Sequence, residues 1–144
     1  DSPGKAGHPP RSEFTLVTRT SDHPIMQGLP AEWRQASDEI YSQLRGPAKN
    51  VTVLATAYAD KAAHPTASGE HEPMLMTISY GKGRVFHTTL GHVGPKETPP
   101  YPSLSSVGFI VTLQRGAEWA ATGKVTQPIP TDFPTAEKAT TRTN

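Results

Sequence analysis

The chain has 144 residues, 14 of them basic and 13 acidic, a formal net charge of +1 and no cysteine. This length suits one domain with its own core, and the balanced charge without a basic stripe argues against a nucleic-acid partner. The lack of cysteine excludes disulfides, thiol catalysis and thiolate zinc sites, and no apolar run approaches the roughly 20 residues of a membrane span.

The first third of the chain predicts one strand and one short helix. Residues 1–13 are rich in Pro and Gly and predict an irregular lead-in. Phe14 to Thr20 alternates apolar and polar side chains, which is typical of a strand. A turn follows at residues 21–24, and Pro30 is suited to the first position of a short helix through Trp33.

The middle of the chain predicts a buried strand and a hairpin. Residues 51–58 form a nearly continuous apolar run, which indicates a strand buried on both faces. Residues 59–72 are polar and predict an exposed loop. The apolar stretch 74–79 then meets Gly81 and Gly83, which can form a tight turn, and the returning strand delivers His92 to a strand end.

The last third predicts one long helix and an extended tail. Four prolines exclude regular structure from residues 93–102. Residues 103–122 carry an apolar stripe at helical spacing, with Ser103 or Ser105 as the N-cap and Gly123 as the C-cap. The prediction is therefore a domain over residues 1–123 and a Pro-rich extended tail with a frayed end over residues 124–144.

Six short motifs, in order, resemble the C-terminal half of ThuA-like (trehalose-utilisation) domains. They span roughly residues 7–123 and comprise Asp22-His23-Pro24-Ile25 with Gly28-Leu29-Pro30, Asp38-Glu39-Ile40-Tyr41, Val53-Leu54-Ala55, Tyr80-Gly81-Lys82-Gly83-Arg84-Val85-Phe86, Leu90-Gly91-His92 and Arg115-Gly116-Ala117-Glu118-Trp119-Ala120.

This resemblance implies an α/β fold that is flavodoxin-like, with the three-layer sheet of class I glutamine amidotransferase domains. Members of the family usually carry a preceding βαβ portion that this sequence lacks, so the fold is expected to be incomplete here. Four strands and one helix cannot cover both faces of a sheet, which likewise favours a fragment or a chain completed by a partner. The family is linked to the catabolism of oxidised (3-keto) disaccharides, so a sugar-type small molecule is the expected ligand.

The candidate catalytic residues are His23, Asp38, Glu39 and His92, and the candidate substrate-binding residues are His8 and Tyr41. Histidine and carboxylate side chains at a strand end are suited to general acid–base catalysis. Each has a plainer interpretation: a loop histidine bonded to backbone, a turn histidine before Pro24, acidic residues at a helix start, or a core tyrosine. Trp119 and Arg84 are predicted to be structural. The zinc motif His-Glu-x-x-His is absent, because Pro73 follows His71-Glu72, and neither a metal nor a cofactor is predicted.

Three hypotheses follow. The first is a protein of trehalose-type sugar catabolism, with hydrolase- or isomerase-like acid–base chemistry in a cleft at the sheet edge. The second is a non-catalytic binding or assembly subunit completed by a partner chain, and the third is a fragment without independent function. Whether the chain is an enzyme stays open at this point. The compartment is also open, with a periplasmic or secreted location favoured over the cytoplasm because the chain has no Cys and many Pro and Thr.

Overall fold

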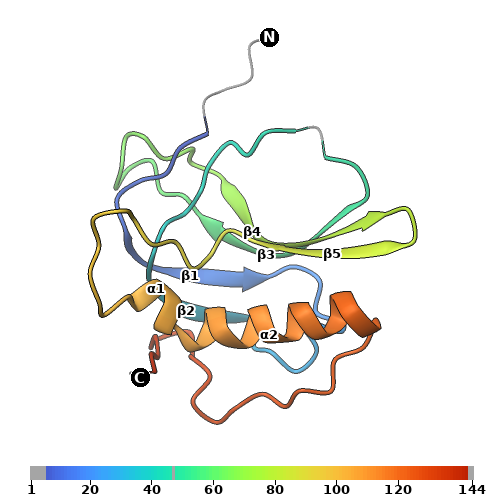
Figure 1. Ribbon diagram of the computed structural model, residues 1–144. Helices are drawn as coiled ribbons and strands as arrows, with labels where there is room; N and C mark the ends of the chain where they lie inside the picture. Colours follow the sequence, from blue (N-terminus) through green and yellow to red (C-terminus); the bar gives the residue numbers. More distant parts are fainter. Residues whose placement is uncertain (1–5, 47, 143–144) are drawn as a thin grey trace.

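The protein is built on one five-stranded antiparallel sheet, with its strands in the order β2-β1-β3-β4-β5 (Figure 1). The computed structural model describes residues 6–46 and 48–142. The strands are β1 (Ser12–Thr18), β2 (Glu32–Asp38), β3 (Val51–Tyr58), β4 (His71–Tyr80) and β5 (Gly83–Thr88).

The expected strands near residues 14–20, 51–58 and 74–92 are confirmed, whereas the short helix predicted from Pro30 is wrong. The chain forms β2 at that place, with Trp33 paired opposite Leu16 of β1. Trp33 and Gln35 both point inward and are fully buried. The polar Gln35 at an inward position hides the alternation of apolar and polar residues, so the sequence pattern does not read as a strand.

The β4–β5 hairpin carries the chain back toward the candidate site. Gly81 has a φ of +57°, a conformation that glycine adopts without a Cβ clash. The register runs from Tyr80 opposite Gly83 to Leu75 opposite Thr88. The loop predicted at residues 59–72 is shorter than expected, because β4 already begins at His71.

Two helices follow, α1 (Pro102–Ser105) and α2 (Val107–Thr122). The predicted C-cap is confirmed, since Gly123 is left-handed and its N–H donates to the Trp119 carbonyl at 2.7 Å. The predicted serine N-caps are wrong: neither helix start has a side-chain cap, and the Ser103 hydroxyl donates to the His92 carbonyl instead.

Helix α2 packs closely against one face of the sheet and contacts both edge strands, β2 and β5 (Figure 1). Gly108 lies against Trp33 and Gly116 against Phe86, where a Cβ would meet ring atoms at 2.9 and 2.1 Å. These two glycines are two helical turns apart and so lie on one face of the helix. The Arg84 guanidinium donates to the Trp119 and Ala121 carbonyls near the end of α2, which agrees with its predicted structural role.

Residues 124–142 run along α2 and β2 without a helix or strand of their own. Phe133 packs on Trp33 with ring centroids 5.7 Å apart, and the Thr135 carbonyl accepts from the Arg34 N–H at 2.7 Å. The expected frayed end is wrong as far as Arg142, whose N–H donates to the Ser105 carbonyl at 2.9 Å. The last two residues lie outside the described part.

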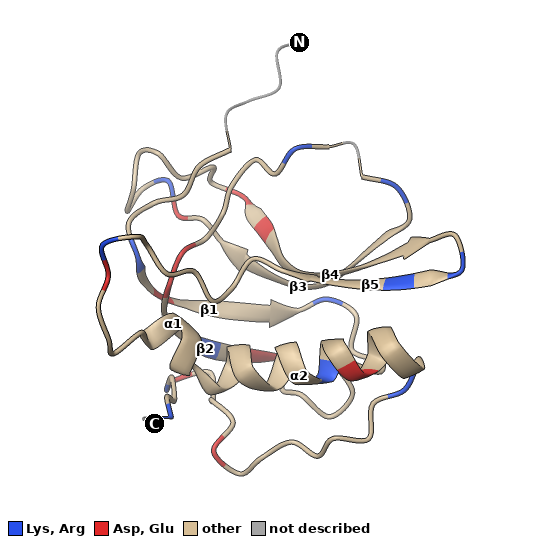
Figure 2. Ribbon diagram, viewed as in Figure 1, with Lys and Arg blue, Asp and Glu red and all other residues tan. Residues whose placement is uncertain are grey.

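The chain is therefore a mixed α/β protein with a curled antiparallel sheet. Lys and Arg are scattered over its described part without a continuous stripe (Figure 2), and nucleic-acid binding is not indicated. Within residues 6–46 and 48–142, no helix has the length and apolar character that a membrane crossing needs.

Candidate functional site

The site forms where the loop after β5 reaches the end of β2, the opposite edge of the sheet order. Asp38 is the last residue of β2, and Gly91 follows β5 at the opposite edge of the sheet order. The Asp38 Oδ2 nevertheless accepts the Gly91 N–H at 2.8 Å. Gly91 has a φ of +87°, and a Cβ there would meet the Phe109 ring at 2.5 Å, so glycine is required at this contact.

Asp38 holds the loop that carries His92. Its other oxygen, Oδ1, accepts the Glu39 N–H at 2.9 Å, and the side chain is buried. Burial raises the pKa of Asp38 above its usual range, and hydrogen bonds from the Gly91, Glu39 and His92 N–H groups partly oppose that rise. The geometry makes Asp38 a positioning residue, because both oxygens are bonded to backbone.

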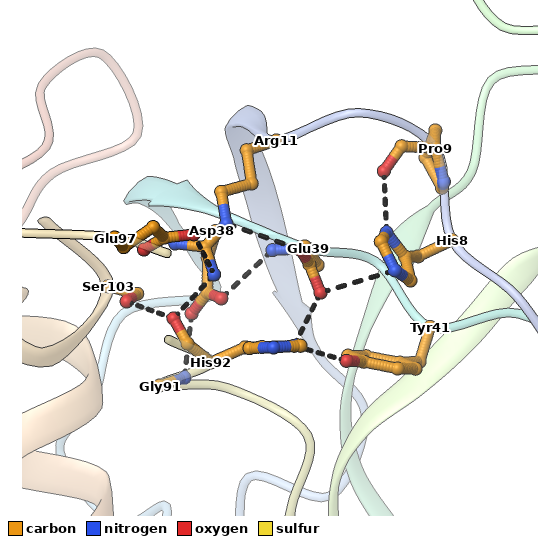
Figure 3. A network of polar contacts seen from close by, with 10 residues as sticks. All are labelled: His8, Pro9, Arg11, Asp38, Glu39, Tyr41, Gly91, His92, Glu97 and Ser103. Atoms are coloured by element: carbon orange, nitrogen blue, oxygen red, sulfur yellow. Dashed lines mark hydrogen bonds and ion pairs between the residues drawn. The ribbon is translucent and has the colours of Figure 1, made fainter. Parts of the chain in front are cut away.

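Glu39 is the centre of a polar network that also contains His8, Arg11, Tyr41 and His92 (Figure 3). Its Oε1 receives the Arg11 Nε–H at 3.2 Å. Its Oε2 lies 2.6 Å from His92 Nδ1 and 3.5 Å from His8 Nε2. The Glu39 side chain is only 9% exposed, and Oε2 has no hydrogen bond of regular geometry within the described residues. A buried carboxylate oxygen in this state is ready to take a proton or a donor.

Tyr41 and His92 stack with their rings 14° from parallel and their centroids 5.9 Å apart. The Tyr41 hydroxyl contacts His92 Nδ1, the nitrogen that also faces Glu39. Burial, followed by hydrogen bonding to Glu39 and its negative charge, raises the pKa of Tyr41 to about 12. The phenol therefore keeps its proton at neutral pH and acts as a donor.

Arg11 and Ser103 fix the backbone of His92. The Arg11 Nη2 donates to the His92 carbonyl at 2.8 Å and pairs with Glu97 at 3.0 Å, while the Ser103 Oγ donates to the same carbonyl at 2.6 Å. Sequence analysis missed these three residues. One signal could have indicated Arg11: the adjacent acids Asp38 and Glu39 require a cation if both are buried.

The structure thus brings together five of the six predicted site residues, His8, Asp38, Glu39, Tyr41 and His92, and places His23 elsewhere. The His23 ring packs on Trp119 of α2, with centroids 4.8 Å apart, and its Nδ1 accepts the Ile25 N–H at 3.2 Å. Burial lowers the pKa of His23. This geometry is that of a turn histidine bonded to backbone.

The network reaches solvent through its two histidines, because the His92 and His8 side chains are 33% and 38% exposed. Exposed imidazoles beside a buried carboxylate can exchange protons with a ligand. In the part of the chain that the structure describes, no group of three or more His, Asp or Glu residues has an arrangement that could hold a metal ion.

Three comparisons relate this chain to known proteins. The model of the ThuA family, described as trehalose utilisation, matches residues 4–120. A ThuA-like protein from Parabacteroides merdae is 46% identical and superposes with a TM-score of 0.88 over 95% of this chain and 48% of its own. A ThuA-like protein from Bacteroides uniformis, 16% identical, superposes with a TM-score of 0.52 over 81% of this chain and 47% of its own, a likeness in fold alone. The chain therefore spans about half the length of these two proteins. A search among curated proteins gives no match.

Proposed function

Because the chain belongs to the ThuA family, we propose that it acts in trehalose-type sugar catabolism and that the Glu39 network performs acid–base chemistry on a keto-sugar. The observation that carries the proposal is the convergence of Glu39 Oε2 and the Tyr41 hydroxyl on His92 Nδ1, with Glu39 Oε2 only 2.6 Å away. A base oriented by a carboxylate, with a neutral donor beside it, is the arrangement that general acid–base catalysis requires.

In this proposal His92 is the base. When its Nδ1 proton is directed at Glu39, the neutral imidazole carries its lone pair on Nε2. Glu39 then stabilises the imidazolium that forms on proton uptake, and Arg11, 3.2 Å away, holds the Glu39 side chain in position. Tyr41 holds its proton and donates a hydrogen bond to Glu39, which helps to fix the carboxylate that orients His92.

The proposed reaction removes a proton from the carbon next to the sugar carbonyl. The C–H bond breaks, its proton moves to His92 Nε2, and its electron pair passes to the carbonyl oxygen as an enolate. In the isomerase-like outcome the proton on His92 returns to the former carbonyl carbon, and the proton of the adjacent hydroxyl moves to the enolate oxygen, so the carbonyl shifts by one carbon. In the hydrolase-like outcome the enolate expels the glycosidic oxygen from the neighbouring carbon, that oxygen takes the proton from His92, and water adds to the resulting double bond.

In this proposal the three-layer, flavodoxin-like arrangement is complete only in a longer protein or in an assembly with a partner chain. The chain aligns with 48% of the Parabacteroides protein, which leaves room in a longer protein for a layer that covers the second sheet face. Residues 1–123 would form the ThuA-like portion and residues 124–144 the Pro-rich tail.

The proposal is tested by incubating the chain with a 3-keto-disaccharide and following the products by chromatography. Glu39→Gln and His92→Gln are each expected to abolish turnover, because they remove the carboxylate and the base. Matched controls are Glu32→Gln and His87→Gln, which change exposed residues of β2 and β5 and should leave turnover intact. Turnover that survives in both site variants would contradict the proposal.

A second candidate function is a non-catalytic binding or assembly subunit. It is favoured by the coverage of only 48% of the Parabacteroides protein, which leaves room for a partner chain that completes the fold. Under this alternative the wild-type chain binds the sugar or a protein partner, produces no product, and Glu39→Gln changes binding alone.

A further inference from the structure

A groove of about 480 Å³ borders two of the segments that build the Glu39 network. Pro9 and Ile40 line it, and their chain neighbours His8 and Glu39 belong to the network. The main polar and aromatic side chains that line it come from the three strands β1, β2 and β3, from the start of β4 and from the loop after β3, namely Thr15, Arg34, Tyr58, Asp60, His64 and His71.

Tyr58 gives this groove an accessible aromatic face. It is the last residue of β3 and is 49% exposed, an unusual value for a tyrosine in a central strand. Tyr58 pairs with His71 across β3 and β4, and their rings lie 5.2 Å apart at 53°. The strand pairing and the neighbouring ring fix the position of Tyr58, so a ligand that packs on it would lose little of its binding free energy to ordering the site.

The other lining groups supply hydrogen-bond donors and acceptors around that ring. Asp60 is exposed and uses its Oδ1 to accept the Ala62 N–H at 2.8 Å. The Arg34 Nε pairs with Glu13 at 3.3 Å, so this part of the groove is close to neutral. His64 and Thr15 are half-buried and can donate or accept.

We propose that this groove binds a neutral saccharide, with one sugar ring packed on Tyr58. The C–H face of a sugar ring is apolar and suits an aromatic surface, whereas its hydroxyls need mixed donors and acceptors. An anionic ligand fits less well, because Arg34 is paired with Glu13 and Asp60 adds a carboxylate to the lining. The ligand class is that of the proposed function, but the groove is separate from the Glu39 network and its occupancy does not require chemistry there.

The test is a titration of trehalose into the ¹⁵N-labelled chain, with amide shifts followed by NMR. We expect saturable shifts at Tyr58, Asp60, His64 and His71, with weak affinity near a Kd of about 1 mM. Tyr58→Ala should weaken binding at least about tenfold, and Tyr58→Phe should keep it, because the ring face remains. Tyr80→Ala is the matched control, since Tyr80 is 82% exposed on the hairpin and outside the groove.

Equal affinity in Tyr58→Ala and the wild-type chain would overturn the inference, as would the absence of any shift at the four groove residues. The two proposals fail separately. Glu39→Gln should leave the groove shifts unchanged, so loss of turnover with intact groove binding supports both. Groove binding in a chain whose turnover does not depend on Glu39 would contradict only the proposed function.

Discussion

Two buried charged side chains are held in opposite ways in this molecule. Arg115 of α2 is 4% exposed and donates to four backbone carbonyls, those of Pro24, Ile25, Gln27 and Gln127, at 2.7 to 3.1 Å. Glu39 is similarly buried, yet its Oε2 has no regular donor and faces two imidazoles.

This difference distinguishes a charged side chain that stabilises the fold, Arg115, from one that is available for chemistry, Glu39. Arg115 joins α2 to the turn at residues 24–27 and to the segment after α2, and every contact goes to a backbone oxygen, of which the Ile25 carbonyl is fully buried. Glu39 instead directs its Oε2 at two partly exposed imidazoles, 2.6 Å from His92 Nδ1 and 3.5 Å from His8 Nε2. Substitution of Arg115 should therefore lower stability, whereas substitution of Glu39 should lower turnover.

The largest expected effect on stability is that of Arg115→Met. Loss of the guanidinium leaves four carbonyls without a donor, so the free energy of unfolding should fall by about 4 kcal/mol. Denaturant unfolding followed by circular dichroism measures it. Arg142→Met is the matched control, because Arg142 pairs with Asp132 at the surface and should change stability little. If Arg115→Met is as stable as Arg142→Met, Arg115 does not have the structural role that the comparison assigns to it.

Glu39→Gln should lower turnover and leave stability nearly unchanged, which is the reverse of Arg115→Met. Turnover of a keto-disaccharide is expected to fall by at least about a hundredfold, equivalent to roughly 2.7 kcal/mol in the activation free energy. Stability should stay within about 1 kcal/mol of the wild type, because the amide keeps the shape and removes a buried charge. The same unfolding experiment beside the activity assay checks both, and a large loss of stability would make Glu39 a structural charge like Arg115.

Asp38→Asn tests the positioning role of Asp38, which holds the loop that carries His92. An asparagine offers one acceptor oxygen, so the N–H of Gly91 or Glu39 loses its partner, at a cost of about 1 to 2 kcal/mol. The pKa of Asp38 is raised in the folded protein, so its contribution to stability is present below its ordinary pKa of 3.8 and is lost as pH rises through the folded value. Unfolding midpoints of the wild-type chain should change with pH across this acidic range, and the Asp38→Asn variant should lose that slope of midpoint against pH. An unchanged slope would show that Asp38 is not the group responsible.

The smallest expected effect is the alkaline behaviour of Tyr41. Its folded pKa of about 12 exceeds the ordinary value of 10.0, so its contribution to stability is complete below pH 10 and declines as pH rises toward 12. Tyr41→Phe should remove this decline. An ultraviolet titration of the phenolate band measures the pKa itself, and a Tyr41 that ionises near pH 10 would contradict the contact with Glu39.

Local patterns were enough to predict the β4–β5 hairpin and helix α2, because each rests on contacts between residues close in sequence, and the buried run of β3, because its apolar residues are consecutive. The C-cap at Gly123 was predictable for the same reason. Strand β2 was not, since Gln35 occupies an inward position that patterning assigns to an apolar residue.

The site was predictable in its residues but not in its assembly. His8, Glu39, Tyr41 and His92 could be named from residue type and motif, but their meeting depends on the loop after β5, which reaches the end of β2. That contact joins residues 53 positions apart in the chain, so no local pattern predicts it. Arg11 and Ser103 were missed because their partners lie 81 and 11 residues away in the chain. His23 matched a motif whose local role is to accept the Ile25 N–H.

The most direct test of the account is deuterium incorporation into a 3-keto-disaccharide in D₂O, followed by ¹H NMR. Proton removal by His92 next to the carbonyl predicts that the wild-type chain exchanges that C–H, that Glu39→Gln and His92→Gln do not, and that Glu32→Gln exchanges it normally. Exchange that continues at the wild-type rate in both site variants, or that never occurs in the wild type, would contradict the assignment of the Glu39–His92 pair as the acid–base centre.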